Sequence, residues 1–141
     1  MWIELIAEMP GVTNLCAAAR EPALRDAERR LGQSLPGELA ALLGETDGVE
    51  GDYGLGLVWP VDRIAAENLA LRGDSDLTRL YMPFDPLLFF GDAGNGDLFA
   101  LVPHTGRPDV FAWNHENDSR TWVAPRLATY LEWWLTGKIT L

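Results

Sequence analysis

The chain of 141 residues contains almost no cysteine and few basic side chains. Cys16 is its only cysteine, so neither an intrachain disulfide nor a cluster of thiolate metal ligands can form within it. No apolar run approaches the roughly 18 residues that a membrane-spanning helix needs. Residues 1–5 lack the basic segment and the small-residue cleavage site of a signal peptide. With 48% hydrophobic residues, we expect a single cytoplasmic domain, residues 1–141, with a core of its own.

Basic residues are also absent from two long windows. None lies between Arg30 and Arg63 or between Arg79 and Arg107, although these windows hold six and three acidic residues. The net charge of −10 argues against binding to nucleic acid or to an anionic membrane. Two interpretations stay open: the windows converge on one negative face, or they form a solvated surface that keeps the protein soluble.

Residues with obvious catalytic chemistry are scarce. The sequence has no phosphate-binding loop, dinucleotide fingerprint or nucleophile elbow. Cys16 lies in the apolar segment 15–19, for which we expect a short helical turn and a buried, inert thiol. His104 and His115 could form a weak metal site with surface carboxylates, but a histidine at the end of a strand more often hydrogen-bonds to the backbone. We expect no catalytic residue, no metal and no cofactor.

The most specific stretch is the glycine-rich turn 91–97, which lies between the apolar runs 87–90 and 98–102. The runs predict two strands, and glycines with positive φ allow the chain to reverse between them. A calcium loop of the EF-hand type that starts at Asp92 would place glycine at two ligand positions and Pro103 at the position of the required glutamate. We therefore interpret the turn as a hairpin whose carboxylates, Asp92 and Asp97, are exposed to a partner.

The order of the elements predicts an α+β fold in one domain, with an antiparallel strand meander packed against N-terminal and C-terminal helices. Residues 1–20 are expected to form an N-terminal helical extension. Loops are expected over 44–51 and 73–78. Helical spacing or capping signals predict helices over 1–9, 13–19, 21–31, 34–43, 60–71 and 125–135, and apolar runs predict strands over 53–59, 87–90, 98–102, 110–113 and 121–123.

Five motifs in order resemble the SUKH superfamily, the Smi/Knr-type domain. The resemblance spans residues 24–137, and its one charge-changing departure is Asp47 where asparagine usually precedes the glycine. The matching segments are Leu-Gly-Gln-Ser-Leu-Pro at 31–36 followed by Thr-Asp-Gly at 46–48, Trp-Pro-Val-Asp-Arg-Ile at 59–64 with Asn68, the turn 91–97 with the strand after it, Trp-Asn-His-Glu at 113–116, and the closing helix 127–135.

This resemblance implies a function that composition alone does not. Bacterial members of the superfamily are mostly immunity proteins, which bind and neutralise a cognate toxin such as a nuclease or deaminase, and other members are scaffold or regulatory domains. An acidic face fits a toxin with a basic active site, because opposite charges steer the two proteins together. We therefore expect a non-catalytic protein-binding module of the immunity type. A regulatory scaffold for a cellular protein is the alternative, and a metal-dependent hydrolase is the least favoured.

The candidate contact surface consists of the acidic and amide side chains of the two basic-free windows. A cognate protein toxin with a basic nuclease or deaminase domain is the expected partner, with neither nucleic acid nor membrane involved. The residues assigned to this surface are Glu45, Asp47, Glu50, Asp52, Asp92, Asn95 and Asp97.

Overall fold

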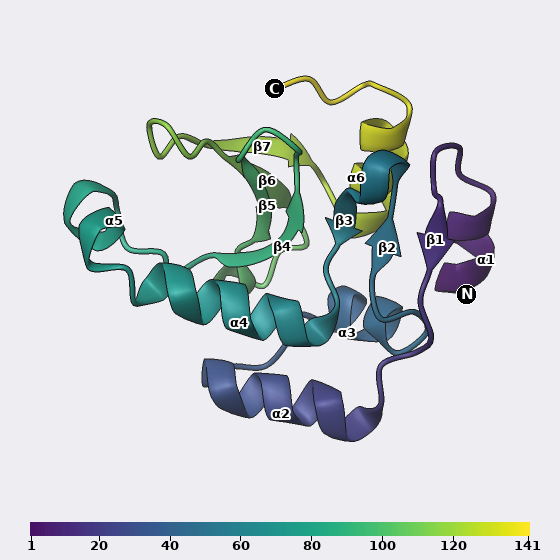
Figure 1. Ribbon diagram of the computed structural model, residues 1–141, viewed down its shortest axis with the longest axis horizontal. Helices are drawn as coiled ribbons and strands as arrows, with labels where there is room; N and C mark the ends of the chain where they lie inside the picture. The colour runs from purple at the N-terminus through teal and green to yellow at the C-terminus, as the bar shows by residue number, and fades with distance from the viewer.

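A computed structural model describes all 141 residues and contains two antiparallel sheets (Figure 1). The larger sheet is a meander in which each strand pairs with the next along the chain, which confirms the predicted α+β class and the strand order. The smaller sheet comprises β1 (Asn14–Leu15), β2 (Val49–Glu50) and β3 (Gly56–Val58), and the larger comprises β4 (Leu88–Asp92), β5 (Leu98–Leu101), β6 (Val110–Trp113) and β7 (Arg120–Ala124).

Six helices surround the sheets, and most follow the predicted signals. The proline predicted for the first turn of α2 occupies it, and Gly32 ends that helix with a left-handed φ of 69°, which favours glycine. None of the helices is long and apolar enough to cross a bilayer. Their bounds are α1 (Trp2–Ala7), α2 (Glu21–Leu31), α3 (Gly37–Leu43), α4 (Val61–Arg72), α5 (Ser75–Leu80) and α6 (Leu127–Leu135).

Several predictions of local structure are wrong. The helical turn expected over 13–19 is absent, because β1 hydrogen-bonds to β2 there. The segment 73–78, expected to be a loop, contains the start of α5, whose first backbone N–H groups are capped by the Asp74 carboxylate. The strand expected over 53–59 is confined to β3, and a 3₁₀ turn precedes it. Leu69, expected to point inward, is exposed.

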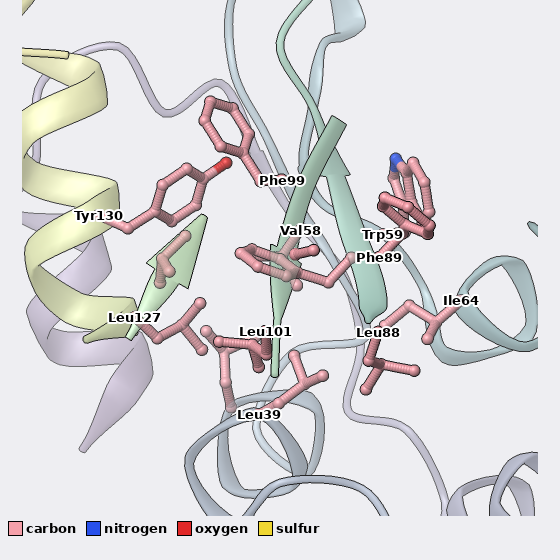
Figure 2. Packing of buried hydrophobic residues seen from close by; sticks show 14 of the residues in the cluster. Leu39, Val58, Trp59, Ile64, Leu88, Phe89, Phe99, Leu101, Leu127 and Tyr130 are labelled. Atoms are coloured by element: carbon pink, nitrogen blue, oxygen red, sulfur yellow. The ribbon is translucent and has the colours of Figure 1, made fainter. Parts of the chain in front are cut away.

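One hydrophobic core joins the two sheets to the helices (Figure 2). The Trp59 N–H donates to the Phe90 carbonyl oxygen, which links the end of β3 to β4. Tyr130 of α6 is fully buried and donates its hydroxyl to the Leu57 carbonyl oxygen at 2.8 Å, so α6 is tied to the smaller sheet as well as to Phe99. A side-chain carbon at Gly91 would overlap the Leu57 carbonyl oxygen, which is why glycine lies where the sheets meet.

Candidate acidic contact surface

The turn between β4 and β5 (residues 93–97, the β4–β5 turn) has the predicted hairpin geometry. Gly94 and Gly96 have φ values of 93° and 97°, which side chains rarely tolerate, and the Ala93 N–H donates to the Asp97 carbonyl oxygen at 3.0 Å. A side-chain carbon at Gly96 would lie 2.8 Å from the His115 ring. Glycine therefore sets both the reversal of the chain and the close approach of the loop that follows β6.

Asp97 is buried, so the prediction that it is exposed is wrong. Its carboxylate contacts His115 Nδ1 at 2.6 Å and accepts the His115 backbone N–H at 3.1 Å, while Asn95 accepts the Asp97 backbone N–H. Burial alone would raise the pKa of Asp97, but these hydrogen bonds from His115 outweigh it and hold that pKa below its ordinary value. Asp97 thus fastens the β4–β5 turn to the loop after β6.

Asp92 is only partly accessible, with 24% of its side chain exposed. It accepts a hydrogen bond from Trp59 Nε1 at 3.0 Å and pairs with Arg63 at 3.1 Å. The Arg63 guanidinium in turn lies 4.5 Å from the centre of the Trp59 ring. The negative charge of Asp92 is therefore largely balanced within the molecule.

Two of the predicted contact residues between Arg30 and Arg63 make hydrogen bonds that stabilise the fold. Asp47 accepts the Val61 backbone N–H at 2.8 Å and so caps the start of α4. Glu45 accepts the Met1 amino group at 2.8 Å and the Ile3 backbone N–H. These hydrogen bonds lower the pKa of Glu45 to about 2.

The loop between β2 and β3 (residues 51–55, the β2–β3 loop) differs from these anchored sites. Asp52 is exposed and its carboxylate makes neither a hydrogen bond nor an ion pair, and the Glu50 carboxylate beside it is also unpaired. Tyr53 is completely exposed and has a φ of 61°, a left-handed conformation that is uncommon for a bulky residue. The molecule therefore presents an aromatic ring and one free carboxylate on this loop, and a second free carboxylate, that of half-buried Glu50, at the end of β2.

The β2–β3 loop and the β4–β5 turn lie side by side. A side-chain carbon at Gly94 would lie 3.4 Å from Leu55 Cδ1, and one at Gly56 would lie 3.1 Å from Asp92 Oδ2. The structure thus brings Asp52 and the exposed Asn95 into the same region, with Asp92 at its margin, whereas Glu45 lies next to the amino terminus of the chain and Asp47 at the start of α4.

The sequence prediction does not include Tyr53 in the contact surface. The only sequence feature that indicates it is a single aromatic residue between Gly51 and Gly54.

Cys16 is in an extended segment rather than a helix and is only partly buried. Burial, and then the charges of Glu50 and Asp47, raise the pKa of its thiol, so it is a weak nucleophile near neutral pH.

The residues considered for a hydrolase are not gathered into one site. His115 is engaged by Asp97, while His104 lies in a 3₁₀ turn beside a shallow hollow that includes Gln33 and Asp85. Nowhere in the chain do three or more His, Cys, Asp or Glu side chains converge to hold a metal ion. A neighbouring hollow of about 540 Å³, lined mainly by leucine and proline with Glu38 and Arg107, lies on the same side.

Comparison with models of known protein families finds one family whose domain covers most of the chain. The model of the SMI1 / KNR4 family (SUKH-1) matches residues 18–133, which is most of the chain and includes both the β2–β3 loop and the β4–β5 turn. A comparison with curated proteins finds no significant match.

Proposed function

The chain belongs to the SMI1 / KNR4 family (SUKH-1), and from this premise we propose that it is a non-catalytic immunity protein that neutralises a cognate toxin. The family generally consists of binding and immunity domains, so a protein partner follows from membership. The more specific proposal is that the β2–β3 loop, together with Asn95 and the accessible edge of Asp92, forms the surface that contacts a basic toxin domain.

Tyr53 is the observation that carries this proposal. A fully exposed tyrosine in a left-handed conformation contributes nothing to the core, and the unusual backbone costs the fold about 1 kcal/mol. Tyrosine is one of the residues that dominate binding energy when a partner buries them. An exposed aromatic ring that follows the free carboxylate of Asp52 in the chain is therefore well suited to insert into a basic pocket of a partner.

The charges around Tyr53 supply the steering. Glu50 and Asp52 are unpaired, and no basic residue occurs between Arg30 and Arg63 in the sequence. Complementary charge raises the rate of encounter and orients the two proteins before contact. Inhibition would then follow from occlusion, since a nuclease or deaminase toxin needs its basic site free to hold nucleic acid.

The seven candidate residues play different parts in this proposal. Glu50 and Asp52 would contact the partner directly, and so would Asn95, which is exposed although its side chain also bonds to Asp97. Asp47, Asp92 and Asp97 would mainly hold the surface in shape, because each is engaged in internal hydrogen bonds, and Glu45 adds negative charge at a distance from Tyr53. Reversing all of these charges at once would therefore confound loss of folding with loss of binding.

A co-expression experiment tests the proposal. The protein encoded by the gene next to this one is expressed in a bacterial host with and without the chain, and growth is measured. We expect the chain to bind that protein and restore growth, and Tyr53→Ala to lose protection while staying folded. Binding to the neighbour with no effect on its toxicity, or no binding at all, would contradict the immunity proposal, and the first result would favour a regulatory scaffold.

A further inference from the structure

Two adjoining surface hollows form one groove at the end of β5 that lies away from the β4–β5 turn. The groove runs between residues 33–38 and residues 101–108, and we name it the α3 groove. Its larger hollow has a volume of about 540 Å³ and its smaller one about 340 Å³, and Ser34 and Pro103 line both. Ligand sites typically have volumes of about 300 to 1,000 Å³. Since neither hollow is enclosed, the groove fits an extended segment better than a small molecule that the protein would have to surround.

The lining of the larger hollow is mainly apolar. Leu35, Leu101 and Leu127 are buried by the rest of the chain and form its base, and Figure 2 shows the latter two near α3. Pro36 and Pro103, whose rings are rigid, contribute to opposite walls. Apolar side chains of a bound segment would therefore be removed from water in this hollow.

Hydrogen bonds within the chain hold both walls in place. The Leu35 N–H donates to Glu28 Oε2 of α2 at 2.8 Å. On the other wall, the Thr105 hydroxyl donates to the Val102 carbonyl oxygen at 2.8 Å and accepts the Arg107 N–H at 3.2 Å. The α3 groove is therefore formed before any partner binds, which lowers the entropic cost of binding.

One charge in the larger hollow has no partner within the chain. Glu38 is half-buried, and its carboxylate makes neither a hydrogen bond nor an ion pair. The only other charged residue that lines this hollow is Arg107, whose Nε lies 2.8 Å from the Asp109 carboxylate. A carboxylate beside apolar surface is therefore the one unbalanced charge that the larger hollow presents.

The smaller hollow adds a second carboxylate, that of Asp85, which is exposed and forms no ion pair. His104 also lines this hollow and is likewise unpaired. The Arg72 guanidinium donates to Gln33 Oε1 in its wall at 2.7 Å. Burial lowers the pKa of Arg72, and the charge of Asp85 opposes that shift, so Arg72 balances part of the Asp85 charge. The groove as a whole therefore attracts cations and repels anions, most strongly at Glu38.

We propose that the α3 groove binds an extended segment of a protein partner in which lysine or arginine accompanies apolar residues, with the cation at Glu38 and the apolar side chains on the leucines. The aliphatic stems of lysine and arginine pack on apolar surface while their charged ends pair with a carboxylate. The net charge of −10 favours a basic partner as well. Because the β2–β3 loop adjoins the turn at the other end of β5, this surface is separate from the proposed toxin contact and independent of it.

Amide NMR spectra of the isotope-labelled chain test this proposal. Two capped peptides are added in turn, Lys-Leu-Pro-Leu-Lys and Glu-Leu-Pro-Leu-Glu, in which proline favours the extended conformation. We expect the basic peptide alone to shift the amide signals of Glu38 and Arg107 in a saturable way, without shifts in the β2–β3 loop. The proposal would be overturned if the basic peptide caused no shifts or if the acidic peptide bound equally well. Hexylamine that bound as tightly as the basic peptide would overturn it too, because the groove would then be a site for a small apolar cation.

Three variants locate the contact, and the spectrum of each shows whether it is folded. Glu38→Gln should weaken binding of the basic peptide about two- to fivefold, as expected for one partly exposed ion pair. Ser34→Trp should abolish binding, because its ring would fill the junction of the two hollows. The matched control is Glu116→Gln, which removes the same charge from an exposed glutamate in the loop after β6. If the control weakened binding as much as Glu38→Gln, the overall charge of the chain and not Glu38 would hold the peptide, which would contradict the proposal.

Discussion

The two neighbouring acidic segments of this protein have opposite relations to the fold. In the β4–β5 turn, Asp97 is buried against His115 and Asp92 is bonded to Trp59 and Arg63. In the β2–β3 loop, the Asp52 carboxylate has no bonding partner and Tyr53 is fully exposed to solvent. The sequence assigns both segments the same character, glycine-rich and negative. The comparison teaches that negative charge by itself does not identify a binding residue, whereas a carboxylate without an internal partner is available to one.

The largest effect is expected from Asp97→Ala. It removes the charged acceptor of both the His115 ring and the His115 backbone N–H, and the loss of these hydrogen bonds should lower the free energy of unfolding by about 2 to 3 kcal/mol. Urea denaturation measures this loss. Asp52→Ala is the matched control, and equal losses for the two variants would remove the distinction between the segments.

The stability of the protein should fall at acid pH, because the hydrogen bonds of Asp97 and Asp118 require ionised carboxylates. The pKa values of Asp97 and Asp118 are lowered in the folded protein, the latter by hydrogen bonds from Met82, Trp113 and Arg120 that outweigh its burial. Their stabilisation is then fully present above the ordinary aspartate pKa and lost as the pH falls from about 4 through the folded values. Thermal unfolding from pH 7 to pH 3 should show a declining melting temperature, with a shallower decline in Asp97→Ala. A parallel decline in both proteins would contradict this assignment.

Asp47→Ala should have an intermediate effect. The carboxylate of Asp47 caps the N-terminus of α4 through the Val61 N–H, and loss of such a cap costs about 1 kcal/mol. Asp47→Asn retains an acceptor and should recover most of that loss in chemical denaturation. If the asparagine variant were no better than alanine, capping would not be the role of this residue.

Asp92→Ala should cost about 1 kcal/mol or less. The pair with Arg63 is solvent-exposed enough to be weak, so the main loss is the hydrogen bond from Trp59 Nε1, and one such bond is worth about 1 kcal/mol. The change is best measured against Arg63→Ala in a double-mutant cycle. Coupling larger than the two single effects would show that the pair is more strongly buried than its exposure indicates.

The smallest effect on stability is expected in the β2–β3 loop. Asp52→Ala should change the free energy of unfolding by less than about 0.5 kcal/mol, because the carboxylate has no partner to lose. Tyr53→Gly should be neutral or slightly stabilising, since relief of the left-handed backbone is opposed by the greater freedom of glycine when unfolded. If either variant lowered the free energy of unfolding by more than about 1 kcal/mol, this loop would stabilise the fold as the β4–β5 turn does.

Local signals predicted much of the fold from the sequence. Three features depend only on residues close together in the chain, so the sequence pattern predicts them: the hairpin at 91–97, the end of α2 at Gly32 and the closing helix. The burial of Asp97 depends on His115, which lies 18 positions away, and no pattern within the turn indicates that contact. The loss of the helix expected over 13–19 has the same origin, because β1 pairs with a distant strand. The exposure of Tyr53 also required the structure, since an aromatic between glycines is as compatible with burial.

The proposed binding surface is tested most directly by the affinity for the protein encoded next to this gene, measured at low and at high salt. The wild-type chain is compared with Glu50→Lys/Asp52→Lys and with Asp76→Lys/Asp85→Lys, a control with the same change in net charge at exposed residues of other segments. We predict at least about tenfold weaker binding for the first pair at low salt, a smaller difference at high salt, and near wild-type binding for the control. Equal affinities for all three proteins at low salt would contradict the claim that the β2–β3 loop contacts the toxin.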